Sequence, residues 1–211
     1  FEKKFINYNS KIFFNAEIYN QGFKTEKKLT EGSNFVTGSY YRLFPIFGVS
    51  SETPFKIKKF NPKLTLNPKI NLVLAPGISN SNKLSNEDST NNDFTIENIY
   101  RLNRYSGSDK LDNSKRITYS INAYTDNFKS SLSQIYEFTN NSNFHKEQGN
   151  DDNLSDLLGS IEYLNDNELS YGFRYDLNDE YLKKQNIDIK SKTKLGELGF
   201  SYLDQNSKIN D

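Results

Sequence analysis

The stretch Lys63–Leu74, KLTLNPKINLVL, decides the fold class because its polarity alternates along the chain. Apolar residues and one proline occupy positions 64, 66, 68, 70, 72 and 74, and polar residues occupy positions 63, 65, 67, 69 and 71. Successive side chains point to opposite faces of a β-strand, so one face of this segment is apolar and the other is polar. The same period recurs at positions 12–18, 117–123 and 169–177, and no helical period of similar length competes with it. The chain is therefore predicted to be all-β.

The composition agrees with strands and excludes several classes of site. The chain has 14 Tyr and 16 Phe although only 34% of it is hydrophobic, and both residues favour half-buried strands. The 27 basic residues balance the 27 acidic ones, so no net charge attracts nucleic acid. The absence of cysteine excludes disulfides, thiolate nucleophiles and cysteine-bound metals.

A membrane location is compatible with the low mean hydropathy of −0.81. A membrane helix needs roughly 18 consecutive apolar residues, and the chain has no such run. A strand of a membrane β-barrel needs only about 10 alternating residues and produces no hydropathy peak. Crossing by strands is therefore open to this chain.

The segments between the alternating runs are of two kinds. Tight turns are predicted at 48–53, 125–127, 165–167 and 194–196, and long connections at 20–33, 75–115, 140–154 and 178–184. The two kinds alternate along the chain, as an up-and-down barrel with short periplasmic turns and long external loops requires. We predict an antiparallel up-and-down transmembrane β-barrel segment of about nine strands.

Two further expectations concern the long connection and the ends of the chain. A loop as long as 75–115 is seldom structureless, so we expect it to fold back into the barrel lumen. Its polar part, Ser79–Asn92, is expected to stay mobile and solvated. Because Phe1 follows no initiator Met or signal sequence, and the final residues do not form a strand ending in an aromatic, residues 1–211 are expected to be one piece of a larger barrel domain.

A family resemblance is carried by residues 96–121, IENIYRLNRYSGSDKLDNSKRITYSI. This stretch resembles the barrel signature of the lipopolysaccharide-assembly family LptD, in which Asn-Arg-aromatic-Ser-Gly-x-Asp precedes a basic residue and an Arg-Leu-Thr-Tyr-Gly type strand. Three positions depart from that pattern: Ser108, Lys110 and Ser120. The flanks 61–69 and 131–138 also resemble the family's neighbouring strands. The matching residues are Asn103, Arg104, Tyr105, Ser106, Gly107, Asp109, Lys110, Arg116, Thr118 and Tyr119.

The resemblance implies a lipid exporter of the bacterial outer membrane and not an enzyme. Such a protein receives lipopolysaccharide (LPS) from an LptA-like periplasmic bridge, surrounds an LptE-like plug lipoprotein and releases LPS sideways into the outer leaflet. It also implies an N-terminal jelly-roll domain and a barrel seam, neither of which is expected within this stretch. Two alternatives remain open: a passive porin or other generic barrel, and a soluble β-rich adhesin module.

The residues of the motif suggest a structural role in the turn itself. Gly107 permits a tight turn, and Asp109 can accept hydrogen bonds from nearby N–H groups or from Arg104. We predict that Asn103–Asp109 packs against the strands from the inside or caps the lumen, with Arg104 or Arg116 paired to a carboxylate such as Asp109 or Asp112. A generic charged surface turn and a contact with ligand are the alternatives.

Catalytic, cofactor and metal sites are not predicted. The single histidine, His145, lies in a polar stretch without a nucleophile or metal ligand at a suitable spacing. The acidic group Asp151, Asp152 and Asp156 is expected to be solvated, without a pKa shift caused by burial. A basic cluster near a predicted periplasmic turn could guide the phosphates of LPS or could be an ordinary charged rim. Its residues are Lys56, Lys58, Lys59 and Lys63.

Overall fold

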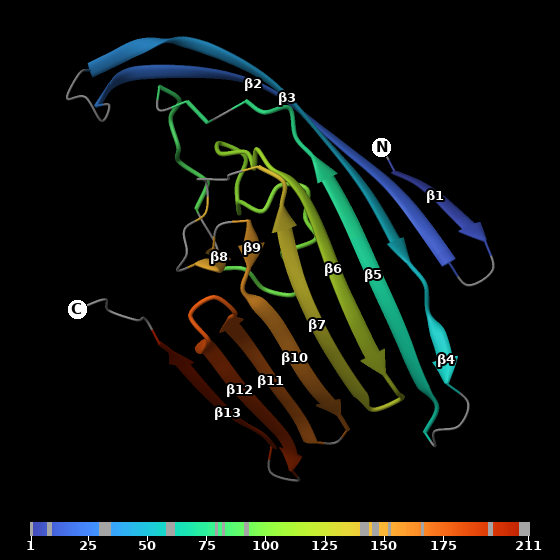
Figure 1. The fold of residues 1–211 in the computed structure, drawn as a ribbon. Helices are drawn as coiled ribbons and strands as arrows, with labels where there is room; N and C mark the ends of the chain where they lie inside the picture. Colours follow the sequence, from blue (N-terminus) through green and yellow to red (C-terminus); the bar gives the residue numbers. More distant parts are fainter. Residues whose placement is uncertain are drawn as a thin grey trace.

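The computed structural model shows one antiparallel sheet (Figure 1). It describes residues 2–7, 10–29, 35–57, 62–78, 80–81, 83–90, 93–139, 144, 148–151, 153–165, 167–193 and 196–206, without the side chains of 2–7, 151 and 193. The strands are β1 (Glu2–Asn7), β2 (Ser10–Leu29), β3 (Phe35–Glu52), β4 (Phe55–Ile57), β5 (Leu64–Leu74), β6 (Lys115–Tyr124), β7 (Phe128–Glu137), β8 (Asn150–Asp151), β9 (Leu154–Ser155), β10 (Leu157–Leu164), β11 (Asn167–Asp176), β12 (Tyr181–Thr193) and β13 (Gly196–Gln205).

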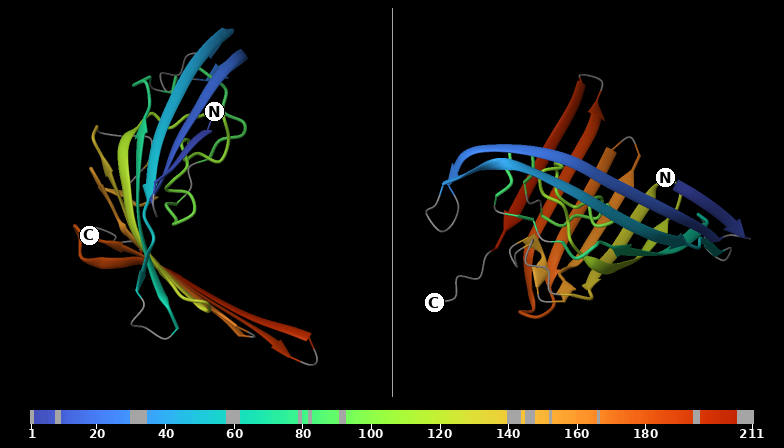
Figure 2. Two further views of the ribbon diagram at one scale, coloured as in Figure 1. Left: turned by 90° about the vertical axis from the view of Figure 1, so that its right-hand side faces the viewer. Right: turned by 90° about the horizontal axis from the view of Figure 1, so that it is seen from above.

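The strand order follows the sequence, which confirms the predicted up-and-down arrangement. The main path is β1-β2-β3-β5-β6-β7-β10-β11-β12-β13, while β4, β8 and β9 pair beside it. In the described part of the chain, nine strands have eight or more residues, the number expected from the alternation. The described strands β1 and β13 form the two edges, so the sheet is open and curved (Figure 2).

The two faces of the sheet differ as the alternation predicts. In β5, Ile70 and Leu74 are exposed on the convex face, whereas Asn71 is buried on the concave face. The register extends this pattern across neighbouring strands, because Ile70 lies opposite Tyr119 of β6 and Ile121 lies opposite Leu132 of β7. A band of apolar side chains therefore crosses the convex face.

Three predicted turn boundaries are wrong. Gly48 does not begin a turn but lies within β3, where its missing side chain leaves room for Leu102. The predicted connection 20–33 is mostly strand, because β2 continues to Leu29. The predicted connection 178–184 is a short turn, because β12 starts at Tyr181. The segments 20–33 and 178–184 were predicted as loops because they are polar. A strand whose two faces are both in water needs no apolar face, so polar residues there do not exclude a strand.

The long connection between β5 and β6 folds onto the concave face, as predicted (Figure 2). We call residues 75–114 the inner loop. Two buried apolar clusters join it to the sheet. The first consists of Phe44, Ile46, Val73, Ala75, Leu102 and Leu111, and the second of Phe94, Ile99, Tyr105, Ile135, Phe144 and Leu158.

Candidate functional site

The inner loop is closed on itself by two aspartates that cap each other's backbone. Asp88 accepts hydrogen bonds from the N–H groups of Ser108 and Asp109, at 3.0 and 2.9 Å. Asp109 in turn accepts from the N–H groups of Glu87 and Asp88, at 2.7 and 3.1 Å. The donors around Asp88 hold the pKa of its carboxyl well below the ordinary value, with the N–H of Ser108 contributing most.

Glycine is required at position 107 by this close approach. A Cβ atom built on Gly107 would lie 2.3 Å from Oδ1 of Asp88 and 2.4 Å from its backbone oxygen. The glycine of the motif therefore serves the packing of two chain segments against each other. The sequence allows either Asp109 or Asp112 as the partner of Arg104. The structure pairs Arg104 with Asp112, whereas Asp109 accepts backbone hydrogen bonds.

Asn103 shapes the turn that carries the motif. Its side-chain nitrogen donates to the backbone oxygens of Gly107 and Lys110, at 3.0 and 3.3 Å. Its side-chain oxygen accepts from the N–H groups of Tyr105 and Asp112, at 3.3 and 3.1 Å. One buried amide thus satisfies four backbone groups and returns the chain from residue 103 to residue 112.

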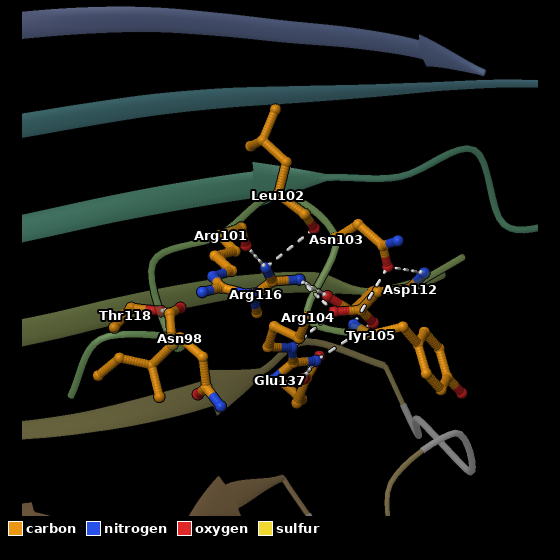
Figure 3. Close-up of polar contacts among 12 residues, drawn as sticks. Asn98, Arg101, Leu102, Asn103, Arg104, Tyr105, Asp112, Arg116, Thr118 and Glu137 are labelled. Atoms are coloured by element: carbon orange, nitrogen blue, oxygen red, sulfur yellow. Dashed lines mark hydrogen bonds and ion pairs between the residues drawn. The ribbon is translucent and has the colours of Figure 1, made fainter. Parts of the chain in front are cut away.

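Arg104 is the centre of a fully buried charge network (Figure 3). Its guanidinium lies 2.5 Å from both Asp112 and Glu137, and the rings of Phe94 and Phe144 lie on it at 4.7 Å. Burial alone would lower the pKa of Arg104, but the charges of Asp112 and Glu137 raise it above its ordinary value. The network fixes the inner loop to the end of β7, which supplies Glu137.

Arg116 extends the same network into β6. It lies 2.9 Å from Asp112 and donates to the backbone oxygens of Arg101 and Leu102, at 2.5 and 3.2 Å. It also donates to the hydroxyl of Ser114. Two arginines and two carboxylates are therefore enclosed together, with a formal charge of zero.

A second charge network holds the other side of the inner loop. Asp93 lies 2.6 Å from Lys184 and 3.5 Å from Arg174, so it joins the loop to β11 and β12. Lys183 lies between Asp156 and Asp176, at 3.0 and 2.8 Å. Asp156 is 1% exposed, and its burial raises its carboxyl pKa. The expectation of a solvated Asp156 without a pKa shift is therefore wrong.

The β2–β3 hairpin contacts the inner loop through hydrogen bonds to backbone oxygens. Arg42 donates to the oxygen of Ser108 at 2.9 Å and holds Gln21, which donates to the same oxygen at 3.1 Å. Thr25 and Lys28 donate to the oxygens of residues 83 and 84. The expectation that the stretch 79–92 is solvated is confirmed for most of its described residues, since only Leu84 and Ser89 are buried. Hydrogen bonds to Asp88 tie this stretch to residues 108 and 109, and its mobility stays a prediction.

Most of the predicted motif residues come together, but not all of them face the loop. Ser106 contacts Thr90 at 2.9 Å, the ammonium of Lys110 lies 5.9 Å from the ring of Tyr105, and Thr118 donates to Ile99 at 3.3 Å. Tyr119 points to the convex face and donates to Gln134.

Other predicted residues lie elsewhere. Lys56 and Lys63 are exposed near the hairpin that joins β3 to β5, far along the strands from the inner loop, whereas Lys58 and Lys59 fall outside the described residues. His145 also falls outside them. The sequence prediction missed Glu137, Asp93 and Lys183. The only signal for Glu137 and Lys183 was a charge near a strand end, and Asp93, within the inner loop, gave no local signal.

The described part of the chain contains no group of three or more residues that could hold a metal ion. None of its described residues forms a helix long and apolar enough to cross a membrane. The arrangement at the inner loop fixes one segment against a curved wall, since Arg104 and Asp112 are paired and buried there.

Comparison with protein families gives one match, to the family described as LPS transport system D (LptD), over residues 3–211. A comparison with curated proteins finds no match.

Proposed function

Because the chain belongs to the LptD family, whose members act in LPS transport at the outer membrane, we propose that it forms part of the barrel wall that delivers LPS to the outer leaflet by lateral release. The family match over residues 3–211 carries this proposal. The LPS would come from an LptA-like periplasmic bridge, and an LptE-like lipoprotein would occupy the barrel interior. No covalent bond changes in this process.

The dimensions of the strands support a membrane-crossing wall. The 11 residues of β5 span roughly 37 Å at about 3.4 Å per residue. With a tilt of about 45°, this corresponds to an apolar band roughly 26 Å tall, close to that of outer-membrane barrels. The convex face carries the exposed apolar side chains that such a band requires, among them Ile70, Ile121 and Leu132.

The concave face supports passage of a hydrophilic headgroup. A cavity of about 290 Å³ lies between the inner loop and strands β10–β12. Polar residues, including Ser160, Ser170 and Asn186, form part of its wall beside the apolar Phe94 and Phe173. Gly172 leaves room for Asn186, because a Cβ atom there would lie 2.5 Å from the Asn186 amide oxygen. Lys56 and Lys63, at the end assigned to the periplasm, are suited to guide phosphates.

The alternatives account for fewer of these features. A passive porin needs an open interior, whereas the inner loop crosses the concave face and is anchored there by the buried Arg104–Glu137 ion pair and the half-buried Asp93–Lys184 pair. A soluble adhesin would leave the apolar band of the convex face in water, which is unfavourable for so large a patch.

Depletion of the full-length protein in cells tests the proposal. We expect newly made LPS to accumulate at the inner membrane, and surface LPS to recover when the wild-type gene is restored. A normal arrival of LPS at the cell surface during depletion would contradict the proposed function. Ion conductance across planar bilayers separates the porin alternative, for which a large, steady open-pore current is expected.

A further inference from the structure

The contact between β3 and the inner loop differs from the other attachments of that loop. Strand β3 pairs with β5 only from Phe47 to Glu52. On that side, its described residues before Phe47 have no strand partner, because β5 ends at Leu74. The hairpin leaves the sheet here and arches over the concave side (Figures 1 and 2). The inner loop packs against the concave side of β3 there, and we call this contact between β3 and the inner loop the loop seam, or the seam for short.

The seam is apolar although most of the concave face is polar. Phe44 and Ile46 of β3 are 1% and 0% exposed, and they pack against Leu102 and Leu111 of the inner loop. Leu102 points away from the Arg104 network toward β5 and β3 (Figure 3). It lies on the bare backbone of Gly48, where a Cβ atom would be 2.5 Å from the Leu102 Cδ2 atom.

The strength of attachment differs between the two sides of the inner loop. Toward β7 and β12 the loop is fixed by ion pairs that include Arg104 with Glu137 and Asp93 with Lys184. Toward β3 its described contacts are apolar packing and hydrogen bonds from the buried Arg42, which donates to the backbone oxygen of Ser108 and to the side-chain oxygen of Asn80. Breaking the buried Arg104–Glu137 pair leaves uncompensated charges, whereas an apolar surface can exchange one apolar partner for another.

We propose that β3 and the inner loop part along this seam to admit one acyl chain of the exported LPS, which then packs against Phe44 and Ile46 in place of Leu102. This inference rests on the proposed function. The outer side of the seam adjoins the exposed apolar residues Leu43, Phe47 and Leu74, so an acyl chain in the seam is continuous with the lipid-facing band. The free edge of β3 supports opening there, because no ladder of backbone hydrogen bonds has to break beyond Phe47.

A reversible cross-link in the full-length protein tests whether the seam must open. Residues 1–211 contain no cysteine, so Gly48→Cys with Leu102→Cys introduces one new disulfide pair within them. The Cβ position of residue 48 lies 3.8 Å from Cγ of Leu102, close enough for a bond after replacement of both side chains. We expect oxidation to abolish delivery of LPS to the surface and a reductant to restore it.

The matched control links two strands that are already paired. Ser120 of β6 lies opposite Ser133 of β7, and both are buried, so Ser120→Cys with Ser133→Cys should leave delivery unchanged after oxidation. Normal delivery with the seam cross-linked would overturn the proposal. If neither the reduced variants nor the wild-type protein restored delivery after depletion, the proposed function itself would fail.

A photoreactive side chain provides a second measurement that does not depend on the disulfide variant. We expect a probe at Phe44 to capture LPS during export, whereas a probe at Ile135, which faces the anchored side of the loop, captures none. Capture of phospholipid alone at position 44, or equal capture of LPS at both positions, would contradict the assignment of the seam to an LPS acyl chain.

Discussion

Replacing Arg104 by Met should destabilise the inner loop strongly, because it leaves an unbalanced charge in a closed site. The wild-type network contains Arg104, Arg116, Asp112 and Glu137, all four with side chains 0% exposed. Without Arg104, Asp112 keeps its pair with Arg116, but Glu137 loses the ion pair that the structure gives it. A buried net charge of −1 remains.

The magnitude follows from that count of charges. Breaking a buried pair by removing one partner costs about 3–5 kcal/mol, and the lost contacts with Phe94 and Phe144 contribute to this loss. Glu137→Leu alone should cost a similar amount, because it leaves a net charge of +1. In the double variant the remaining Arg116–Asp112 pair is neutral, so we expect it to be less destabilised than either single variant.

Denaturant unfolding of the purified full-length protein in detergent measures these free energies, with tyrosine fluorescence and circular dichroism as the two signals. The four proteins form a double-mutant cycle that isolates the coupling between the two residues. Simple addition of the two single losses in the double variant, or an Arg104→Met protein as stable as wild type, would refute the reasoning that the network is balanced in pairs.

Three further predictions concern the faces of the sheet and the clamp of the inner loop, which consists of Asp88 and Asp109 with the backbone N–H groups that donate to them. Ile161→Lys places a charge on the convex face and should lower the free energy of unfolding by roughly 2–4 kcal/mol near mid-membrane. Ser160→Lys places the charge in the cavity of the concave face and should lower it less. Equal losses of unfolding free energy in denaturant would contradict the assigned faces. Gly107→Ala should destabilise the clamp by about 1–3 kcal/mol through overpacking. Gly22→Ala is the control, because no atom lies near its Cβ position and little effect is expected. Protease cleavage of the inner loop should be faster in the first variant and unchanged in the second. The pKa of Asp88 is lower in the folded loop than the ordinary value of about 3.9, so its clamp contributes fully above pH about 4 and is lost as pH falls below it. Amide exchange of its two backbone donors, measured relative to the intrinsic rate at each pH, should therefore lose protection on acidification. In Asp88→Asn the protection should be low at every pH, so a wild-type protection profile in that variant would exclude the carboxylate as the clamp.

Several features of the fold were accessible from local sequence. Alternation at 63–74 identified a strand and both its faces, because the period of a strand depends only on the order of neighbouring residues. The same reasoning located the turn at 125–127, where β6 ends at Tyr124 and β7 begins at Phe128. It failed at β2 and β3, since their outer ends lie beyond the apolar band and carry polar residues on both faces.

The candidate site was predictable only in part. The spacing within residues 103–112 allowed a pair between Arg104 and Asp112, which the structure confirms at 2.5 Å. The carboxylate of Glu137 lies 33 residues from Arg104 along the chain, and no local pattern connects them. The same holds for Asp88, whose role depends on residues 20 or more positions away.

The sequence by itself determined which segments are strands, which of their faces is apolar and which family the motif resembles, because these depend on residues that are close in the chain. Only the tertiary structure decided that the inner loop is anchored by ion pairs toward β7 and β12 but by apolar contacts and the hydrogen bonds of Arg42 toward β3. That difference depends on which side chains the curvature of the sheet brings to the loop. Burial then gives the few charges enclosed there their effect, because an unpaired charge is far more costly inside the protein than in water.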